Sequence, residues 1–311
     1  MDEIKGFPVQ LSKGLEFKLK FKKIKIDKII LAGMGGSALP GELLKNYVNL
    51  NIPFEIHRNY SLPKTTKNTL LMACSYSGNT EETISALKEG LKRKIKIIVY
   101  SNGGVLTEMA IKNNLPLIKI PGGIQPRNAF GYFFYSFTKT LDDLGLTNKT
   151  KEVKKTGKWL DKQEFKTIEN ECIGKTPLIY TNSFLEGVGR ACKIKFNENA
   201  KTPAFFNVFP ELNHNEMNGF ENLNSKFVVF YLKSAVDSEK IKKRMKITKN
   251  LLEKKGVKVI ELNSPGKTLL QDAFYYLHYF NFLTVKLAKL YGVDPWKVEL
   301  VEKLKKELSK K

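Results

Sequence analysis

The sequence is poor in cysteine and has no long apolar run, and each absence argues against a class of protein. Its three cysteines, Cys74, Cys172 and Cys192, are scattered without a Cys-x-x-Cys pair. This pattern indicates neither a disulfide framework nor a zinc site, and it fits a reducing compartment. No apolar run approaches the roughly 20 residues that a membrane-spanning helix needs. We therefore expect a cytoplasmic protein with no membrane partner.

Histidine and acidic residues are also scarce. His57, His214 and His278 form no metal-ligand spacing, so we expect no metal. We expect no other cofactor either. The chain holds 53 Lys and Arg residues against 31 Asp and Glu residues, a formal net charge of +22. Such a balance attracts anions. Because the lysines are spread along the chain without a zinc finger, a basic-aromatic RNA motif or a KH loop, we expect no nucleic-acid partner.

Short β-like runs alternate with helical stretches along the 311 residues. This alternation is typical of βαβ units in a doubly wound parallel sheet. A lysine-rich helical connector at about 148–172 separates two cycles of such units, and a helix over 269–290 carries aromatics suited to a core or a subunit contact. We predict two α/β domains in tandem, residues 1–152 and 153–311. The predicted strands span residues 29–32, 54–57, 69–74, 96–100, 117–120, 177–182, 226–232 and 257–261.

A hydroxyl-rich turn, Ser75-Tyr76-Ser77-Gly78-Asn79-Thr80, follows the predicted strand 69–74 and precedes an amphipathic helix. A helix N-terminus offers unpaired amides and a positive dipole end, and three hydroxyls add donors, so the turn is suited to hold a phosphate. It also fits an ordinary capped helix start, with Asn79 as N-cap and Glu82 in the capping-box position. The turn alone leaves both interpretations open.

The turn after the predicted strand 29–32 raises another alternative. Gly33-x-Gly35-x-x-Ala38 satisfies the dinucleotide fingerprint, and Glu55 follows about 20 residues later, as in a NAD-dependent oxidoreductase. However, Glu55 lies inside a predicted strand rather than at its end, and Ser37 places a hydroxyl in the turn. One hexose phosphate explains both turns, whereas a dinucleotide explains only this one.

Three motifs are specific when they are taken together: Gly33-Met34-Gly35-Gly36-Ser37-Ala38, Ser75-Tyr76-Ser77-Gly78-Asn79-Thr80-Glu81-Glu82-Thr83 and Pro210-Glu211-Leu212-Asn213-His214-Asn215-Glu216. The set closely resembles the bifunctional phosphoglucose/phosphomannose isomerase family, which is built from two sugar-isomerase (SIS) domains of flavodoxin-like fold. Shorter matches at 57–63, 126–132, 197–201 and 292–295 extend the resemblance over nearly the whole chain. The resemblance implies a metal-independent isomerase that interconverts glucose 6-phosphate and mannose 6-phosphate with fructose 6-phosphate through an enediolate.

The resemblance also implies a role for each matching residue. Glu198 would move the proton between C1 and C2, and His214, reaching the site from the partner subunit of a homodimer, would open the ring. Arg127 would stabilise the enediolate, and Lys303 would assist at the ring oxygen. The N-terminal domain would bind the sugar phosphate, and the C-terminal domain would carry the catalytic Glu and His. The phosphate-binding residues would be Gly35, Gly36, Ser37, Ser75, Ser77 and Thr80.

These residue types suit aldose–ketose isomerisation. An imidazole that titrates near neutrality can hand a proton between O1 and O5, and a positioned carboxylate can take the weakly acidic C–H proton. An arginine that never deprotonates can stabilise negative charge on the oxygens. Glucose and mannose 6-phosphates differ only at C2, so one base serves both if the intermediate rotates about C2–C3.

One position departs from the family pattern. After Gly292-Val293-Asp294-Pro295 the family commonly has a threonine that is associated with placing a water for the mannose reaction, and this chain has Trp296. The indole supplies no hydroxyl, so the resemblance implies the phosphoglucose activity more firmly than the phosphomannose activity. A non-catalytic SIS-type regulator that binds phosphosugars is the other alternative. The presence of Glu198, His214 and Arg127 argues against it, as does the absence of a helix-turn-helix segment.

Overall fold

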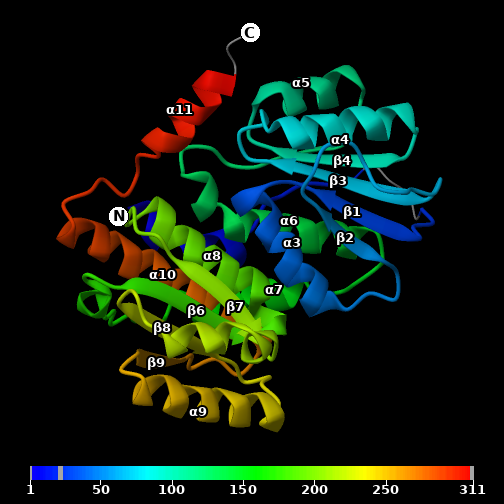
Figure 1. The fold of residues 1–311 in the computed structure, drawn as a ribbon. Coiled ribbons are helices and arrows are strands. Elements are labelled where there is room, and N and C mark those ends of the chain that lie inside the picture. Colours follow the sequence, from blue (N-terminus) through cyan, green and yellow to red (C-terminus); the bar gives the residue numbers. More distant parts are fainter. Residues whose placement is uncertain (1, 20–23, 309–311) are drawn as a thin grey trace. The chain divides into compact units, whose positions relative to one another are not determined.

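The computed structural model describes residues 2–19 and 24–308, and within them the chain forms two compact units. Unit 1 runs to Gln163 and adds Leu269–Phe274, whereas unit 2 comprises Glu164–Thr268 and the residues from Tyr275 onward. Each unit is an α/β structure built on a parallel sheet (Figure 1). The predicted fold class is therefore confirmed. The outermost residues of the two predicted domains, 1 and 309–311, lie outside the described part of the chain.

Among the described residues, unit 1 holds a five-stranded parallel sheet in the order β2-β1-β3-β4-β5. All of β3 is buried, as in a strand covered on both faces. The predicted strands of this unit are confirmed with ends shifted by at most a residue. They are β1 (Lys28–Ala32), β2 (Phe54–His57), β3 (Thr69–Ser75), β4 (Lys96–Ser101) and β5 (Leu117–Lys119).

Helices cover both faces of this sheet. Side chains of α4 and α5 pack with Ile30, Leu71 and Val99 on one face. On the other face, Gly41 of α3 lies against Leu31, and Phe137 of α6 meets Tyr100 edge to face, with ring centroids 4.9 Å apart. The helices of unit 1 are α1 (Asp2–Lys5), α2 (Phe7–Ser12), α3 (Gly35–Val48), α4 (Glu81–Lys92), α5 (Gly104–Lys112), the 3-10 turn η1 (Pro126–Asn128), α6 (Phe130–Asp143) and α7 (Thr150–Leu160).

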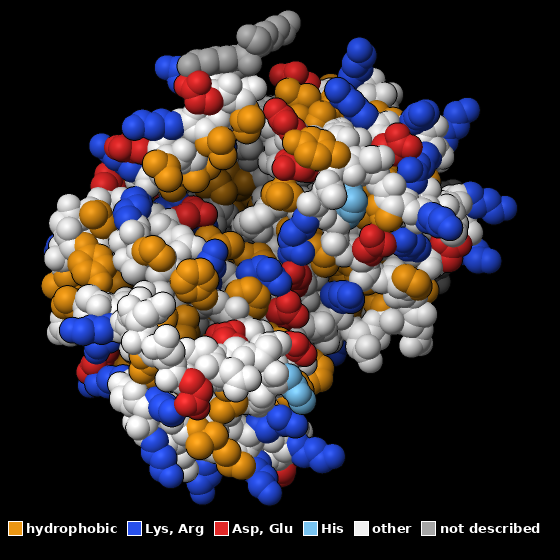
Figure 2. All heavy atoms as spheres, in the orientation of Figure 1, with side chains coloured by type: hydrophobic (Ala, Val, Ile, Leu, Met, Phe, Trp, Pro, Cys, Tyr) orange, Lys and Arg blue, Asp and Glu red, His pale blue; other side chains and the backbone are white. Residues whose placement is uncertain are grey.

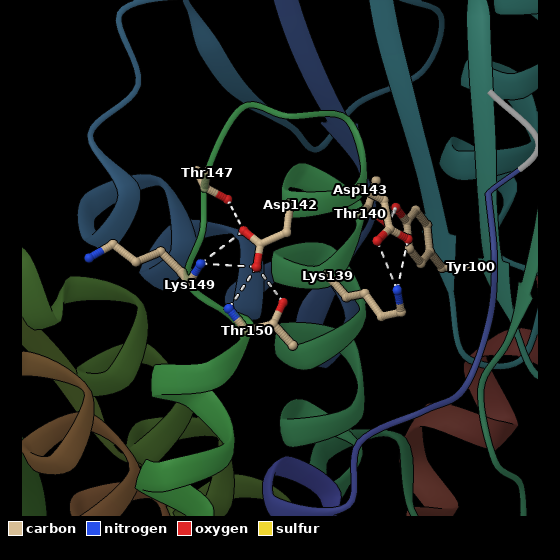
Figure 3. A network of polar contacts seen from close by, with 8 residues as sticks. All are labelled: Tyr100, Lys139, Thr140, Asp142, Asp143, Thr147, Lys149 and Thr150. Atoms are coloured by element: carbon tan, nitrogen blue, oxygen red, sulfur yellow. Dashed lines mark hydrogen bonds and ion pairs between the residues drawn. The ribbon is translucent and has the colours of Figure 1, made fainter. Parts of the chain in front are cut away.

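The half-buried carboxylate of Asp142, near the end of α6, links this helix to the start of α7 (Figure 3). Asp142 accepts hydrogen bonds from the amides of Lys149 and Thr150, at 2.9 and 2.7 Å, and from the hydroxyls of Thr147 and Thr150. Burial would raise the pKa of Asp142, but the hydrogen bonds from Thr147 and Thr150 outweigh it and hold the pKa below its ordinary value. Its neighbour Asp143 forms an i,i+4 ion pair with Lys139 at 2.8 Å.

The two units divide between Gln163 and Glu164, whereas the prediction divides the domains between residues 152 and 153, inside α7. α7 stays with unit 1 because it packs closely on α2. A Cβ on Gly157 would lie 2.5 Å from the amide nitrogen of Ser12. The predicted helix 148–172 is also too long, since α7 ends at Leu160 and only a 3-10 turn, η2 (Glu169–Cys172), follows.

Unit 2 holds a four-stranded parallel sheet in the order β7-β6-β8-β9 within the described residues. Three of its strands match predicted ones, but β7 (Phe205–Phe209), at the edge, was not predicted. The strands and helices are β6 (Thr176–Asn182), η3 (Ser183–Leu185), α8 (Glu186–Glu198), β7, η4 (Glu211–His214), η5 (Glu216–Glu221), β8 (Phe227–Lys233), α9 (Glu239–Lys254), β9 (Lys258–Asn263) and α11 (Glu299–Leu308).

The helix α10 (Leu269–Leu290) has the predicted bounds and contributes to both units. Its Phe274 belongs to unit 1, where the ring packs on Phe7, Phe130 and Phe134 with centroids 6.1, 5.9 and 5.1 Å away. In unit 2, Phe280 packs on other core rings. Phe274 and Phe280 are therefore core residues.

Basic side chains are dispersed over the face drawn in Figure 2, with acidic side chains between them. No helix in the described part of the chain is long and apolar enough to cross a membrane. The same residues contain no group of three or more His, Cys, Asp or Glu side chains placed to hold a metal ion.

Candidate active site

In the β3–α4 turn, the side-chain hydroxyls lie close to one another and do not cap the N-terminus of α4. The Oγ atom of Ser75 lies 2.8 Å from Thr80 Oγ1 and 3.4 Å from Ser77 Oγ. α4 begins at Glu81, so Thr80 rather than Asn79 occupies the N-cap position, and its side chain caps no amide among the described residues. Asn79 instead accepts a hydrogen bond from the amide of Val105 on α5 (3.1 Å). The capping interpretation is wrong, and the three hydroxyls cluster at the carboxyl end of β3.

The β1–α3 turn lies beside this cluster, because β1 and β3 pair in parallel and their carboxyl ends are adjacent. The amide of Tyr76 donates a hydrogen bond to Ser37 Oγ at 3.1 Å, which joins the two turns. α3 begins at Gly35, and Gly35 adopts the left-handed conformation with φ of +46°. Ser37 and Ser75 thus lie close together at the carboxyl ends of the adjacent strands β1 and β3.

A buried thiol fixes the β1–α3 turn from below. The Sγ atom of Cys74 donates to the carbonyl oxygens of Ala32 (3.2 Å) and Ser37 (3.4 Å). Burial raises the pKa of the Cys74 thiol, so it stays protonated and remains a donor. Gly33 permits this contact, since a Cβ there would lie 2.7 Å from the Cys74 sulfur.

The 3-10 turn η1 places Arg127 next to the β1–α3 turn. A Cβ on Gly36 would lie 3.1 Å from both Arg127 Cα and the carbonyl oxygen of Pro126, so there is little room for a side chain on Gly36. Arg127 is only 5% exposed, and its Nη1 donates to Gln125 Oε1 at 3.2 Å. The backbone of a buried arginine therefore lies beside the N-terminus of α3.

Tyr76 was not predicted as a site residue, yet it links this group of turns. Its hydroxyl donates to the carbonyl of Pro121 (3.0 Å) and accepts from the amide of Ile124 (3.3 Å), in the loop that leads to Arg127. Burial is the main cause that raises the pKa of Tyr76, which keeps the hydroxyl protonated. The sequence feature that could have pointed to Tyr76 is its position between Ser75 and Ser77, where a large aromatic side chain interrupts a hydroxyl-rich turn.

Together these turns of unit 1 gather residues whose chemistry is suited to binding an anion. The first amides of α3 and α4 have no partner within their own helices, and each N-terminus carries positive partial charge. The hydroxyls of Ser37, Ser75, Ser77 and Thr80 supply additional donors, and Arg127 supplies a full positive charge. Charge-assisted hydrogen bonds of this kind suit a phosphate group. We call this group of residues, with Gly35 and Gly36, the anion site.

The dinucleotide alternative fails at its acidic residue. Glu55 lies within β2, opposite Ile30 of β1, and its Oε2 forms an ion pair with Lys28 Nζ at 2.8 Å. The residue at the end of β2 is His57, whose Nε2 lies 2.9 Å from the carbonyl oxygen of Ser61. Glu55 is thus occupied inside the strand, where it cannot serve as the ribose-binding acid.

Glu198 is the last residue of α8 and is half-buried in unit 2. Two neighbours on this helix end bond to α10: Lys195 Nζ donates to Asn281 Oδ1 (2.5 Å), and Asn199 Nδ2 donates to Thr284 Oγ1 (2.8 Å). The backbone carbonyl of Glu198 accepts from Lys201 Nζ. These bonds hold the backbone that carries the Glu198 carboxylate.

His214 ends the 3-10 turn η4 and is exposed. The preceding residue anchors this turn to α9: Asn213 Nδ2 donates to Thr248 Oγ1 at 2.8 Å, and Arg244 Nη1 donates to Asn213 Oδ1 at 3.3 Å. By contrast, His278 of α10 is buried between the rings of Phe165 and Phe282. Burial lowers the pKa of His278 to about 3, so it is a neutral core residue.

The predicted site residues thus fall into two sets. Unit 1 brings together the predicted phosphate-binding residues and Arg127. In unit 2, Glu198, His214 and Lys303 lie on three different elements, namely α8, η4 and α11. All residues of α11 are exposed, Lys303 among them. Trp296 lies in the loop before α11, and its amide donates to Asp294 Oδ1 at 2.8 Å.

Comparison with known families gives a match in each unit. Residues 20–104 match the family described as "SIS domain", and residues 161–308 match "Bacterial phospho-glucose isomerase C-terminal SIS domain". Both matches agree with the parallel α/β sheets described above.

Comparison with individual proteins gives relatives in sequence and in fold. The bifunctional phosphoglucose/phosphomannose isomerase of Aquifex aeolicus is 35% identical over 292 residues, which cover 91% of this chain and 90% of that protein. The D-glucosamine-6-phosphate 4-epimerase of Sulfolobus acidocaldarius is 37% identical over 196 residues, 61% of this chain and 63% of that protein. The crystal structure of glucosamine-6-phosphate deaminase from Thermotoga maritima has the same fold, with a TM-score of 0.71, 19% identity and coverage of 95% and 96% of the two chains.

Proposed function

Because the chain belongs to the family of bifunctional phosphoglucose/phosphomannose isomerases, we propose that it interconverts glucose 6-phosphate and mannose 6-phosphate with fructose 6-phosphate. The anion site of unit 1 is the observation that supports this most directly. It combines clustered hydroxyls, two helix N-termini and the buried Arg127. All three hexose phosphates carry the same phosphate group, so one such site serves them all.

We assign the proton transfer to Glu198. Its carboxylate takes a proton from the carbon next to the carbonyl and returns it to the neighbouring carbon, which converts aldose to ketose through an enediolate. Arg127 stabilises the negative charge that develops on the enediolate oxygens, as a buried cation does where water is excluded. Hydrogen bonds of Lys195 and Asn199 to α10 support this role, because they fix the end of α8.

Ring opening is assigned to His214, with Lys303 assisting at the ring oxygen. The exposed position of His214 suits a residue that acts in the site of a partner subunit, and we propose a homodimer in which His214 crosses the interface. No metal or cofactor takes part in the proposed chemistry. We place the enzyme in the cytoplasm, at the hexose phosphate steps of glycolysis and gluconeogenesis.

A coupled assay tests the reaction and its base. We expect wild-type protein to convert both aldose phosphates to fructose 6-phosphate with and without EDTA. Glu198→Gln should lower kcat by about 10²- to 10⁴-fold, the usual contribution of a general base, while fructose 6-phosphate still binds. Glu186→Gln is the matched control, because Glu186 begins the same helix in an exposed ion pair with Arg190. Full activity of Glu198→Gln would refute the assignment.

The same assay separates two other outcomes. Epimerisation of glucosamine 6-phosphate without isomerisation of the aldose phosphates would match the activity for which the Sulfolobus relative is named and would refute the proposal. Activity on glucose 6-phosphate with weak activity on mannose 6-phosphate would keep the reaction and point to Trp296, which lacks a hydroxyl for placing a water.

A further inference from the structure

We infer that Glu3 and Gln10, on the N-terminal helices α1 and α2, are positioning residues that hold Arg127 in the anion site. The inference rests on the proposed function, in which Arg127 stabilises the enediolate. Neither residue belongs to a motif that the sequence pointed to. Both are more than 100 positions away from Arg127 along the chain, so the fold alone brings them to it.

With one oxygen, Glu3 bonds to residues on both sides of Arg127 in the sequence: the backbone amide of Gln125 and the side chain of Asn128. Its Oε1 accepts hydrogen bonds from the amide of Gln125 and from Nδ2 of Asn128, the latter at 2.8 Å. Gln125 in turn uses its side-chain oxygen to accept from Arg127 Nη1. The carboxylate therefore fixes the residue that orients the guanidinium as well as the residue that follows it.

Gln10 fixes the other end of the same segment. Its side chain is 2% exposed, and Nε2 donates to the carbonyl oxygen of Asn128 at 2.8 Å. Its Oε1 accepts from the amide of Tyr132, in the first turn of α6, at 3.2 Å. The contact depends on Gly131, where a Cβ would lie 2.8 Å from Gln10 Cβ and Oε1. One buried carboxamide thus joins η1 to α6.

The position of this segment affects the proposed chemistry because the Arg127 backbone has little room to move. Its Cα already lies against Gly36, at the N-terminus of α3. A shift of η1 therefore either presses on the phosphate-binding turn or withdraws the guanidinium from it. Displacements of about 1 Å in such groups can cost on the order of 10² in rate. Glu3 and Gln10 oppose this shift through their hydrogen bonds to Gln125 and Asn128.

A double-mutant cycle tests the inference. We would measure kcat and KM for fructose 6-phosphate, and the affinity for a five-carbon aldonate phosphate whose carboxylate resembles the enediolate. Glu3→Ala should lower kcat at least about tenfold and weaken aldonate binding in parallel, with KM changed less than about threefold. Glu3→Gln keeps the accepting oxygen and should restore most of kcat. In an Arg127→Ala background, Glu3→Ala should cause no further loss, because coupled residues are not additive.

Controls separate positioning from folding and from the proposed function. Asp2→Ala, an exposed change on the same helix, should leave kcat unchanged. If Glu3→Ala does not fold, Gln10→Met, which removes both bonds to the segment with little change in volume, should give the same loss of kcat. Wild-type kcat in Glu3→Ala, or an undiminished further loss in Arg127→Ala, would overturn the inference. Wild-type kcat in Arg127→Ala would instead refute the role of Arg127 in the proposed function.

Discussion

At the scale of single residues, the close approach of Gly36 to the Arg127 backbone links the N-terminus of α3 to η1. The atoms that a Cβ on Gly36 would meet belong to backbone, which cannot rotate away as a side chain can. Gly36 is the second residue of α3, where helix propensity favours alanine over glycine by up to about 1 kcal/mol. Glycine at this position therefore reflects the needs of the site rather than those of the helix.

We predict that Gly36→Ala lowers kcat/KM about ten- to a hundredfold on both aldose phosphates, because the methyl group moves η1 and the guanidinium together. The free energy of unfolding should change by less than about 1 kcal/mol, since the gain in helix propensity offsets the strain. The coupled assay and urea unfolding measure the two quantities. Gly103→Ala is the control, as its Cβ would meet open space. Wild-type kcat/KM in Gly36→Ala would contradict this account of the close approach.

Sequence reasoning identified the hydroxyl cluster and Arg127 but not the residues that support them. Its capping interpretation failed because capping rules consider only nearby residues, whereas Asn79 bonds to Val105 on another helix. Tyr76 and Glu3 have their bonding partners in distant segments as well. No periodicity in the sequence encodes such partners, so only the folded chain reveals them.

At the scale of elements, the junction of α6 and α7 depends on one carboxylate. Asp142 accepts hydrogen bonds from two backbone amides and two hydroxyls at, or just before, the start of α7. Asp143, its neighbour, forms the ion pair with Lys139 that Figure 3 also shows. The two aspartates therefore provide a matched pair for mutation.

Asp142→Ala should lower the free energy of unfolding at pH 7 by about 2 kcal/mol, the upper range for a lost helix cap. Asp143→Ala should lower it by less than about 1 kcal/mol, as exposed ion pairs contribute little. Because the folded-state pKa of Asp142 lies below its ordinary value of 3.8, its stabilisation is present above that pH. It is lost as the pH falls through the folded-state pKa. Urea unfolding at pH 7 and at pH 3 should thus show a smaller difference between Asp142→Ala and wild type at pH 3; an equal difference would contradict the linkage.

Regular elements were predicted well where burial imposes a pattern. The buried strands and the long helix α10 stand out because their apolar residues recur with a strand or helix period. The edge strand β7 was missed, since Phe205 is exposed and Asn207 interrupts the apolar run. The connector helix was predicted too long, because lysine spacing alone does not mark the end at Leu160.

At the scale of the whole molecule, the net charge of +22 should draw in dianionic substrates. Added salt screens this attraction, with a Debye length that falls from about 30 Å at 0.01 M to about 8 Å at 0.15 M. We predict that kcat/KM for glucose 6-phosphate falls several-fold between roughly these two salt concentrations, while kcat stays nearly constant. Steady-state assays over a sodium chloride series measure both constants. A kcat/KM that does not vary with salt would show that the charge serves another purpose.

The division of α10 has a consequence for synthesis on the ribosome. Chains generally fold from the N-terminus as they emerge. Unit 1, however, takes Leu269–Phe274 into its structure, and the Phe274 ring packs on Phe7, Phe130 and Phe134. A nascent chain in which all five strands of the unit 1 sheet have been synthesised still lacks the Phe274 ring. The first unit to be translated therefore completes its core only after most of the second unit, Glu164–Thr268, has been made.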